Sequence, residues 1–112
     1  RNTVNRIWAR YFGRGLVHPL DQMHSSNPPS HPELLDWLER DFIAHGYDVQ
    51  RLVRGIVLSE AYARSSAWTA NGPTPGPEAF AFAVARPLSP KQLSLSLSIA
   101  TGNPQQFAAD ME

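Results

Sequence analysis

Two stretches near the start of the chain place the tightest limits on its fold. NRIWARYFGRGLV (5–17) has the pattern of a helix that stops at glycines, and NPPSHPELLDWL (27–38) that of a proline-rich loop leading into a second helix. Gly13 and Gly15 favour the backbone angles at which helices end. Helical spacing of apolar residues predicts the first helix over 2–12, with this stripe: Val4, Ile7, Trp8, Tyr11 and Phe12.

The second helix is expected to begin after Ser30 and to stop at Gly46. Ser30 can cap the helix, Glu33 at the third helical position can bond back to the cap, and Pro32 is tolerated in the first turn. This combination predicts a capping box. The apolar stripe of this helix is Leu34, Leu35, Leu38 and Phe42.

A third helix is expected to follow Asp48, which is a favourable N-cap residue. Continued far enough, this helix would place Glu60 on its buried side. Either the helix breaks near Ser59, or Glu60 pairs with a cation such as Arg64. The expected stripe is Val49, Leu52, Val53, Ile56 and Val57.

The C-terminal third begins with an irregular stretch. Residues 69–77, TANGPTPGP, hold three Pro and two Gly, which predicts a linker or an extended crossover. Further on, LSLSLS (93–98) alternates like a strand, but a capping signature at Ser89, Pro90 in the first turn and Gly102 favour a helix. Such a helix has apolar residues on two sides, which predicts burial on both. Asn103-Pro104 is expected to open a last short helix.

These elements predict an all-α fold, a small bundle of four to five short helices with a proline-rich loop and a Pro/Gly-rich crossover. The 112 residues suit one domain, with a helical part over 1–68, a linker or crossover over 69–85 and C-terminal helices over 86–112. The chain starts at Arg1, without Met and close to a helical pattern. We therefore expect it to be a fragment of a longer protein.

Composition argues against several classes of function. Ten basic and ten acidic residues cancel, so no nucleic-acid partner is expected. No apolar run approaches the roughly 20 residues that span a bilayer, so no membrane insertion is expected. The absence of Cys excludes disulfides, thiolate metal sites, Cys nucleophiles and covalently attached haem. We expect no cofactor.

Three loop residues are candidates for a metal site, although no bound metal is expected. His18, Asp21 and His24 are spaced three apart, and two imidazoles with one carboxylate can form an open-sided site for iron or zinc. The alternative is that they are solvated, because such spacing in a loop does not bring three ligands together.

Two further groups are candidates for binding. His31 and Glu33 could form an acid–base pair at a helix N-terminus, or Glu33 could simply complete a capping box. Arg6 and Arg10, with Arg14, could bind a sulfated or carboxylated polymer, or could pair with acidic residues of the second helix.

Two tryptophans lie outside the predicted core stripes. Trp37 is off the main stripe of its helix, and Trp68 stands just before the Pro/Gly-rich stretch. Each could belong to a docking surface for a missing part of the protein, or could pack on a second side of its own element.

Four segments of the chain resemble a known family, the planctomycete-type domain of unknown function 1553. They are NRIWARYFGRGLV (5–17), PPSHPELLDWL (28–38), DVQRLVRGIVLSEAYARSS (48–66) and RPLSPKQLSLSLSIATG (86–102). The resemblance implies a helical module at the C-terminal end of a large exported or periplasmic protein, with an upstream domain and sometimes a cytochrome c-like domain. It implies no reaction, cofactor or catalytic residue. DQMH (21–24) departs from the family pattern of an acidic pair followed by Phe.

Three functions remain open from the sequence. The first is a non-catalytic structural or binding module that supports the upstream domain of the same parent chain. The second is an enzyme part in which the 18–33 loop completes an active site shared with that domain. The third is binding of anionic polysaccharide. The isolated fragment could also form a homodimer through apolar surface that the missing partner would cover.

Overall fold

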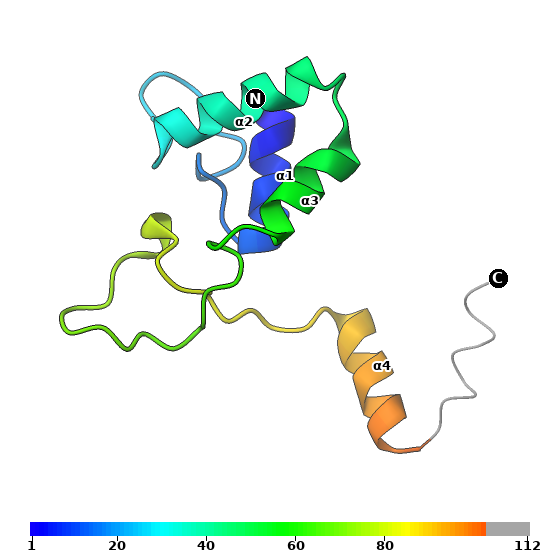
Figure 1. Ribbon diagram of the computed structural model, residues 1–112. Coiled ribbons are helices and arrows are strands. Elements are labelled where there is room, and N and C mark those ends of the chain that lie inside the picture. Colours follow the sequence, from blue (N-terminus) through cyan, green and yellow to red (C-terminus); the bar gives the residue numbers. More distant parts are fainter. Residues whose placement is uncertain (103–112) are drawn as a thin grey trace.

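The computed structural model describes residues 1–102, and these residues form four α-helices (Figure 1). The helices are α1 (Asn2–Phe12), α2 (Pro32–Ala44), α3 (Val49–Val57) and α4 (Pro90–Ala100), with a 3-10 turn, η1, at Pro77–Ala79. No strand occurs in this part of the chain, so the predicted all-α fold is confirmed. The helix expected after Asn103 lies outside the described residues.

Helices α1, α2 and α3 form the body of the fold. Each of the three packs against the other two, and in Figure 1 both α2 and α3 cross α1. The predicted stripes supply most of the buried core, and Leu16 and Val17 of the loop complete it. The buried apolar residues are Val4, Trp8, Leu16, Val17, Leu35, Leu38, Phe42, Leu52 and Ile56.

The start of the 16–29 loop is fixed to α1 by a buried amide. Asn5 is 0% exposed. Its Nδ2 donates to the Val17 carbonyl oxygen, and the Val17 amide donates to its Oδ1, each at 2.9 Å. A side chain at Gly15 would overlap both this amide and the Val17 carbonyl. The loop therefore enters the core at its first residues, which the sequence pattern did not reveal.

The predicted capping box of α2 is wrong. The N-cap residue is His31, without a side-chain cap bond, and the helix starts at Pro32. The Ser30 amide donates to the Leu16 carbonyl oxygen at 2.8 Å. This contact holds Ser30 in the loop and moves the cap position one residue on, so Glu33 has no capping box to complete.

Helix α3 follows the prediction at both ends. The Oδ1 atom of Asp48 accepts a hydrogen bond from the Arg51 amide at 2.9 Å. The helix ends at Val57, and Glu60 is exposed. Of the two alternatives for Glu60, the break in the helix is the correct one.

Residues 63–86, called the return segment here, cross back over the end of α1. The Ala83 amide donates to the Ser65 carbonyl oxygen at 3.0 Å. The Phe80 ring lies edge-on to the rings of Trp8 and Phe12, with centroids 5.5 Å from each. Apart from η1 the backbone of 69–86 is irregular, as its Pro and Gly content predicted.

Helix α4 forms as predicted, but its surroundings differ from the prediction. Ser89 and Gln92 form the expected capping box. The expected burial on two sides is wrong, because the large apolar side chains of α4 are 41–63% exposed. Figure 1 shows α4 standing apart from α1, α2 and α3. Within residues 1–102, nothing covers its apolar surface.

Candidate functional site

A groove between α2 and α3 is the main surface feature of the three-helix body. Its volume is about 550 Å³. Core residues from all three helices reach it: Trp8 from α1, Leu38 from α2, and Leu52 and Ile56 from α3. These core residues are buried, and they form the floor of the groove between the two helices. We call this feature the α2–α3 groove.

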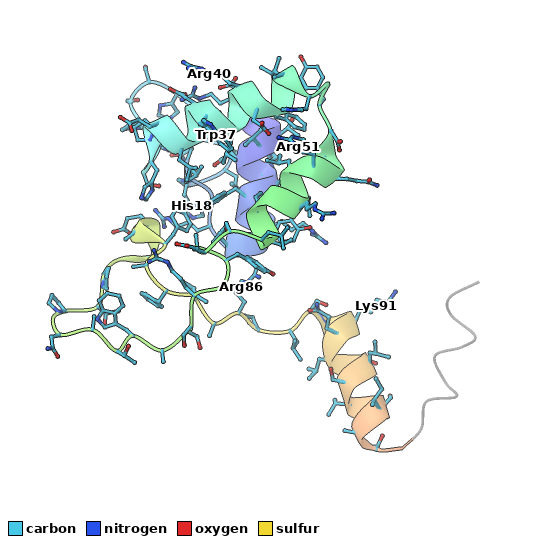
Figure 2. The ribbon with its side chains drawn as sticks, in the orientation of Figure 1. His18, Trp37, Arg40, Arg51, Arg86 and Lys91 are labelled. Atoms are coloured by element: carbon cyan, nitrogen blue, oxygen red, sulfur yellow. The ribbon has the colours of Figure 1, made fainter. Side chains whose placement is uncertain are left out.

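Two large apolar side chains stand at the edges of the α2–α3 groove. Trp37 of α2 is 62% exposed, and Leu58, just past the end of α3, is 73% exposed. Figure 2 labels Trp37 on α2 and Arg51 on α3, on the two sides of the groove. An apolar patch of this kind on a soluble domain is typical of an interaction surface. The structure thus favours the docking alternative for Trp37.

Gly55 leaves part of the α3 wall bare. A Cβ atom built at Gly55 would have no atom within 4 Å apart from its own helix backbone. Glycine inside a helix costs up to about 1 kcal/mol relative to alanine. No crowding within residues 1–102 explains why this helix has glycine there. An incoming backbone could therefore approach α3 closely at this point.

Three polar residues of the groove, Asp41, Arg51 and Ser59, are engaged in structural contacts. Asp41 Oδ1 lies 3.2 Å from both an Arg51 guanidinium nitrogen and the His45 Nδ1. The Ser59 hydroxyl donates to the Ile56 carbonyl oxygen at 2.6 Å and so continues the end of α3. These arrangements give the groove neither a nucleophile with its base nor a free acid–base pair. It is suited to binding apolar surface.

A second surface gathers positive charge at the C-terminal end of α1. A shallow cavity of about 300 Å³ is lined by Arg6, Arg10, Arg14 and His18. Arg6 also pairs with Asp21 in the loop. We call this feature the cationic pocket. Figure 2 shows His18 near this end of α1.

The sequence had singled out Arg6, Arg10 and Arg14, but it had grouped His18 with the candidate metal ligands. Asp21 is bonded to Arg6, and the Nδ1 of His24 lies 2.8 Å from the Ser26 hydroxyl. Across residues 1–102, no three His, Cys, Asp or Glu side chains come together as metal ligands. His18, Asp21 and His24 are therefore not brought together here.

His31 and Glu33 share no hydrogen bond within the described part of the chain. The Nδ1 of His31 lies 3.1 Å from the Ser30 hydroxyl, and its ring centroid is 5.8 Å from that of Phe80. Glu33 is exposed in the first turn of α2. The geometry makes His31 part of the packing beneath the return segment.

Three residues that hold the loop and the return segment in place were not found from the sequence. Asn5 holds the loop, Phe80 covers the end of the core, and Arg86 donates to the Arg10 and Tyr11 carbonyl oxygens at 2.8 and 3.0 Å. Only the aromatic side chain of Phe80 in a Pro/Gly-rich stretch offered a signal. Trp68 lies near Phe82 in the return segment, with ring centroids 6.3 Å apart.

The described residues define a small all-α module with an apolar groove and no assembled set of catalytic side chains. The family model for proteins of unknown function DUF1553 (PSD1) matches residues 1–111, and the chain belongs to this family. This match confirms the resemblance to the domain of unknown function 1553, while the planctomycete type and the C-terminal placement stay predictions. No curated protein and no solved structure shows a significant match. Over residues 1–102, no helix has the length and apolar character needed to span a bilayer.

Proposed function

We propose that this domain is a non-catalytic binding module that docks an apolar helix in the α2–α3 groove. The observation that carries the proposal is the groove itself, which has a floor of buried apolar side chains and the exposed Trp37 and Leu58 at its edges. Binding of an amphipathic helix in an apolar groove is a common mode of recognition between polypeptides.

The energetics support this mode of binding. Burying one large apolar side chain contributes about 1.5–3 kcal/mol. Trp37 and Leu58 are mostly exposed in the free module, so both would gain from a docked helix. Polar groups at the edge, such as the Asp41–Arg51 pair, can stay hydrated while the centre becomes dry.

The wider setting is part of the same proposal. The resemblance of the motifs at 5–17 and 28–38 to the family implies a module of an exported or periplasmic protein, next to an upstream domain. In that setting the module supports its neighbours by packing helices together. Catalysis is then the task of other parts of the assembly.

Photo-cross-linking tests the docking function. With benzoylphenylalanine in place of Trp37, irradiation of the purified full-length chain should join the groove to a helical polypeptide segment, identified by mass spectrometry. Ile43 provides a matched control, since it is 50% exposed on the same helix but does not line the groove. Equal cross-linking from positions 37 and 43 would contradict the proposal.

A second candidate function, binding of anionic polysaccharide, is favoured by the cationic pocket. Arg10 and Arg14 make no side-chain ion pair or hydrogen bond within residues 1–102, and His18 lies in the same cavity. Guanidinium groups bind sulfate and carboxylate through paired hydrogen bonds. The pocket therefore offers free cationic donors on a chain with no net charge.

Retention on a heparin column tests this candidate. Arg10→Ala should weaken binding about two- to fivefold, as expected for one exposed ionic contact, and should lower the salt concentration of elution. Arg40→Ala removes the same charge from an exposed site on α2 outside the pocket and should elute like the parent chain. If both variants shift equally, the retention reflects overall charge and the pocket has no role.

A further inference from the structure

We propose that the helix docked in the α2–α3 groove is α4 of a second copy of this chain. Two copies would then exchange their α4 helices in a two-fold symmetric dimer. This inference rests on the docking function proposed above and names its partner.

Helix α4 has the surface that such a groove requires. Leu93, Leu95, Leu97 and Ile99 are 48, 41, 57 and 63% exposed. At about 100° per residue, Leu93 and Leu97 lie on one side of the helix, and Leu95 and Ile99 lie about 200° away on the other. A helix inserted between two helical walls needs apolar side chains on two opposite sides. The two sides of α4 meet this need.

The surface between the two apolar sides of α4 is formed by small residues. Ser94 and Ser98 are four residues apart and share this surface. Serine hydroxyls in a helix can bond to a carbonyl of the preceding turn, so they can be buried without losing a partner. Gly55, on the wall of the groove, has open space in place of a side chain. The small residues on both elements permit close approach of the two backbones.

Acidic residues near one end of the groove fit one direction of α4. Leu34 and Ala61 line this end, and each is preceded in sequence by an acid, Glu33 and Glu60. Neither acid takes part in an ion pair within the described residues. Lys91 lies in the first turn of α4, whose N-terminal end also carries positive partial charge.

Toward the opposite end of the groove, Arg51 in the first turn of α3 pairs with Asp41 at 3.2 Å. The C-terminal end of α4 exposes backbone carbonyls with negative partial charge and has no basic residue in its last turn. Placing Lys91 near Glu60 therefore brings opposite charges together at the acidic end of the groove, and the C-terminal end of α4 then lies beside the Arg51–Asp41 pair.

The connection to α4 indicates why the groove receives α4 from a second copy. Arg86 is fixed to the end of α1 by its two hydrogen bonds to backbone carbonyls. Only 87–89 separate it from α4, a reach of about 10 Å at most. Arg86 and Ser89 each precede a proline, which restricts them to extended backbone, and Ser89 has ψ 156. Such a spacer is semi-rigid. Figure 1 shows it directing α4 away from its own body.

Light scattering coupled to size-exclusion chromatography tests the exchange on the full chain. The parent chain should form a dimer that dissociates on dilution. Gly55→Lys should block the groove, and Leu93→Gln with Leu97→Gln should disable α4. Each change should raise the dissociation constant about tenfold or more. All three positions are exposed, so the fold should be retained, as thermal unfolding will verify.

Mixing the two variants gives the sharper result. One variant has an intact α4 and the other an intact groove, so the mixture should recover dimers that neither forms alone. A parent chain that stays monomeric at every concentration, or a dimer that withstands both changes, would overturn the proposal.

Cross-linking from position 37 in a mixture of ¹⁵N-labelled and unlabelled chains separates the exchange from the docking function. A mixed-isotope product with residues 90–100 supports the exchange. A product with another segment, or with α4 of the same copy, overturns the exchange and leaves the docking function in place. If position 37 gives no cross-linked product above the background at position 43, both the exchange and the docking function are contradicted.

Discussion

Replacing Asn5 with Ala is expected to lower the free energy of unfolding by about 2–4 kcal/mol. The change removes two hydrogen bonds to the backbone of Val17, which is itself buried. It leaves one donor and one acceptor without partners, and each buried, unsatisfied polar group costs about 1–3 kcal/mol. Urea unfolding followed by tryptophan fluorescence measures the loss.

Asn2→Ala is the matched control for this change. Asn2 begins the same helix but is exposed, so its loss should alter the free energy of unfolding by less than about 0.5 kcal/mol. If the two variants unfold at the same urea concentration, Asn5 does not hold the loop to α1.

Leu35→Ala is expected to cost about 2–5 kcal/mol, the range for removing a fully buried leucine side chain. Leu35 is 0% exposed and contributes to the core shared by α1, α2 and α3. Helices from three directions limit how far the resulting cavity can collapse. Thermal or urea unfolding of dilute protein would measure the effect on the monomer.

The same substitution at Leu97 provides the comparison. Leu97 is 57% exposed on α4, so Leu97→Ala should change the stability of the dilute monomer by less than about 0.5 kcal/mol. A loss comparable to that of Leu35→Ala would show that α4 packs against its own body. The pair therefore tests which part of the chain makes up the cooperative core.

The helices could be predicted from sequence because their signals are local. The stripe from Val4 to Phe12, the caps at Asp48 and Ser89, and the stop at Gly13 each depend on residues a few positions apart. The start of α2 could not be predicted in the same way. The Ser30 amide bonds to Leu16, a residue 14 positions earlier, and this tertiary contact overrides the local capping signal.

The candidate site depends mostly on contacts that the sequence pattern does not contain. Trp37 could be recognised as lying off its stripe, but the groove beside it is created by the spacing of α2 and α3. His18 joins Arg10 and Arg14 because the chain bends at Gly13 and Val17 is fixed by Asn5. Arg86 reaches Arg10 across 76 positions of sequence.

Helix α4 shows a different limit of sequence patterns. Its alternating Leu and Ser residues correctly indicated two apolar sides, and the inference that its own chain covers them was wrong. The pattern shows which sides of the helix are apolar, but it does not show which molecule buries them. An apolar pattern in a helix that follows a short extended spacer such as 87–89 is therefore a poor guide to intramolecular packing.

The position of Phe80 bears on how this fold can change during evolution. Its ring lies against Trp8 and Phe12, and Tyr62 also lies against Phe12, with ring centroids 5.9 Å apart. The chain between Tyr62 and Phe80 is thus a closed loop whose two ends are held by the core. Doubling the length of such a loop costs only about 0.6 kcal/mol in closure entropy. Insertions within 69–76 should therefore leave the three-helix core intact.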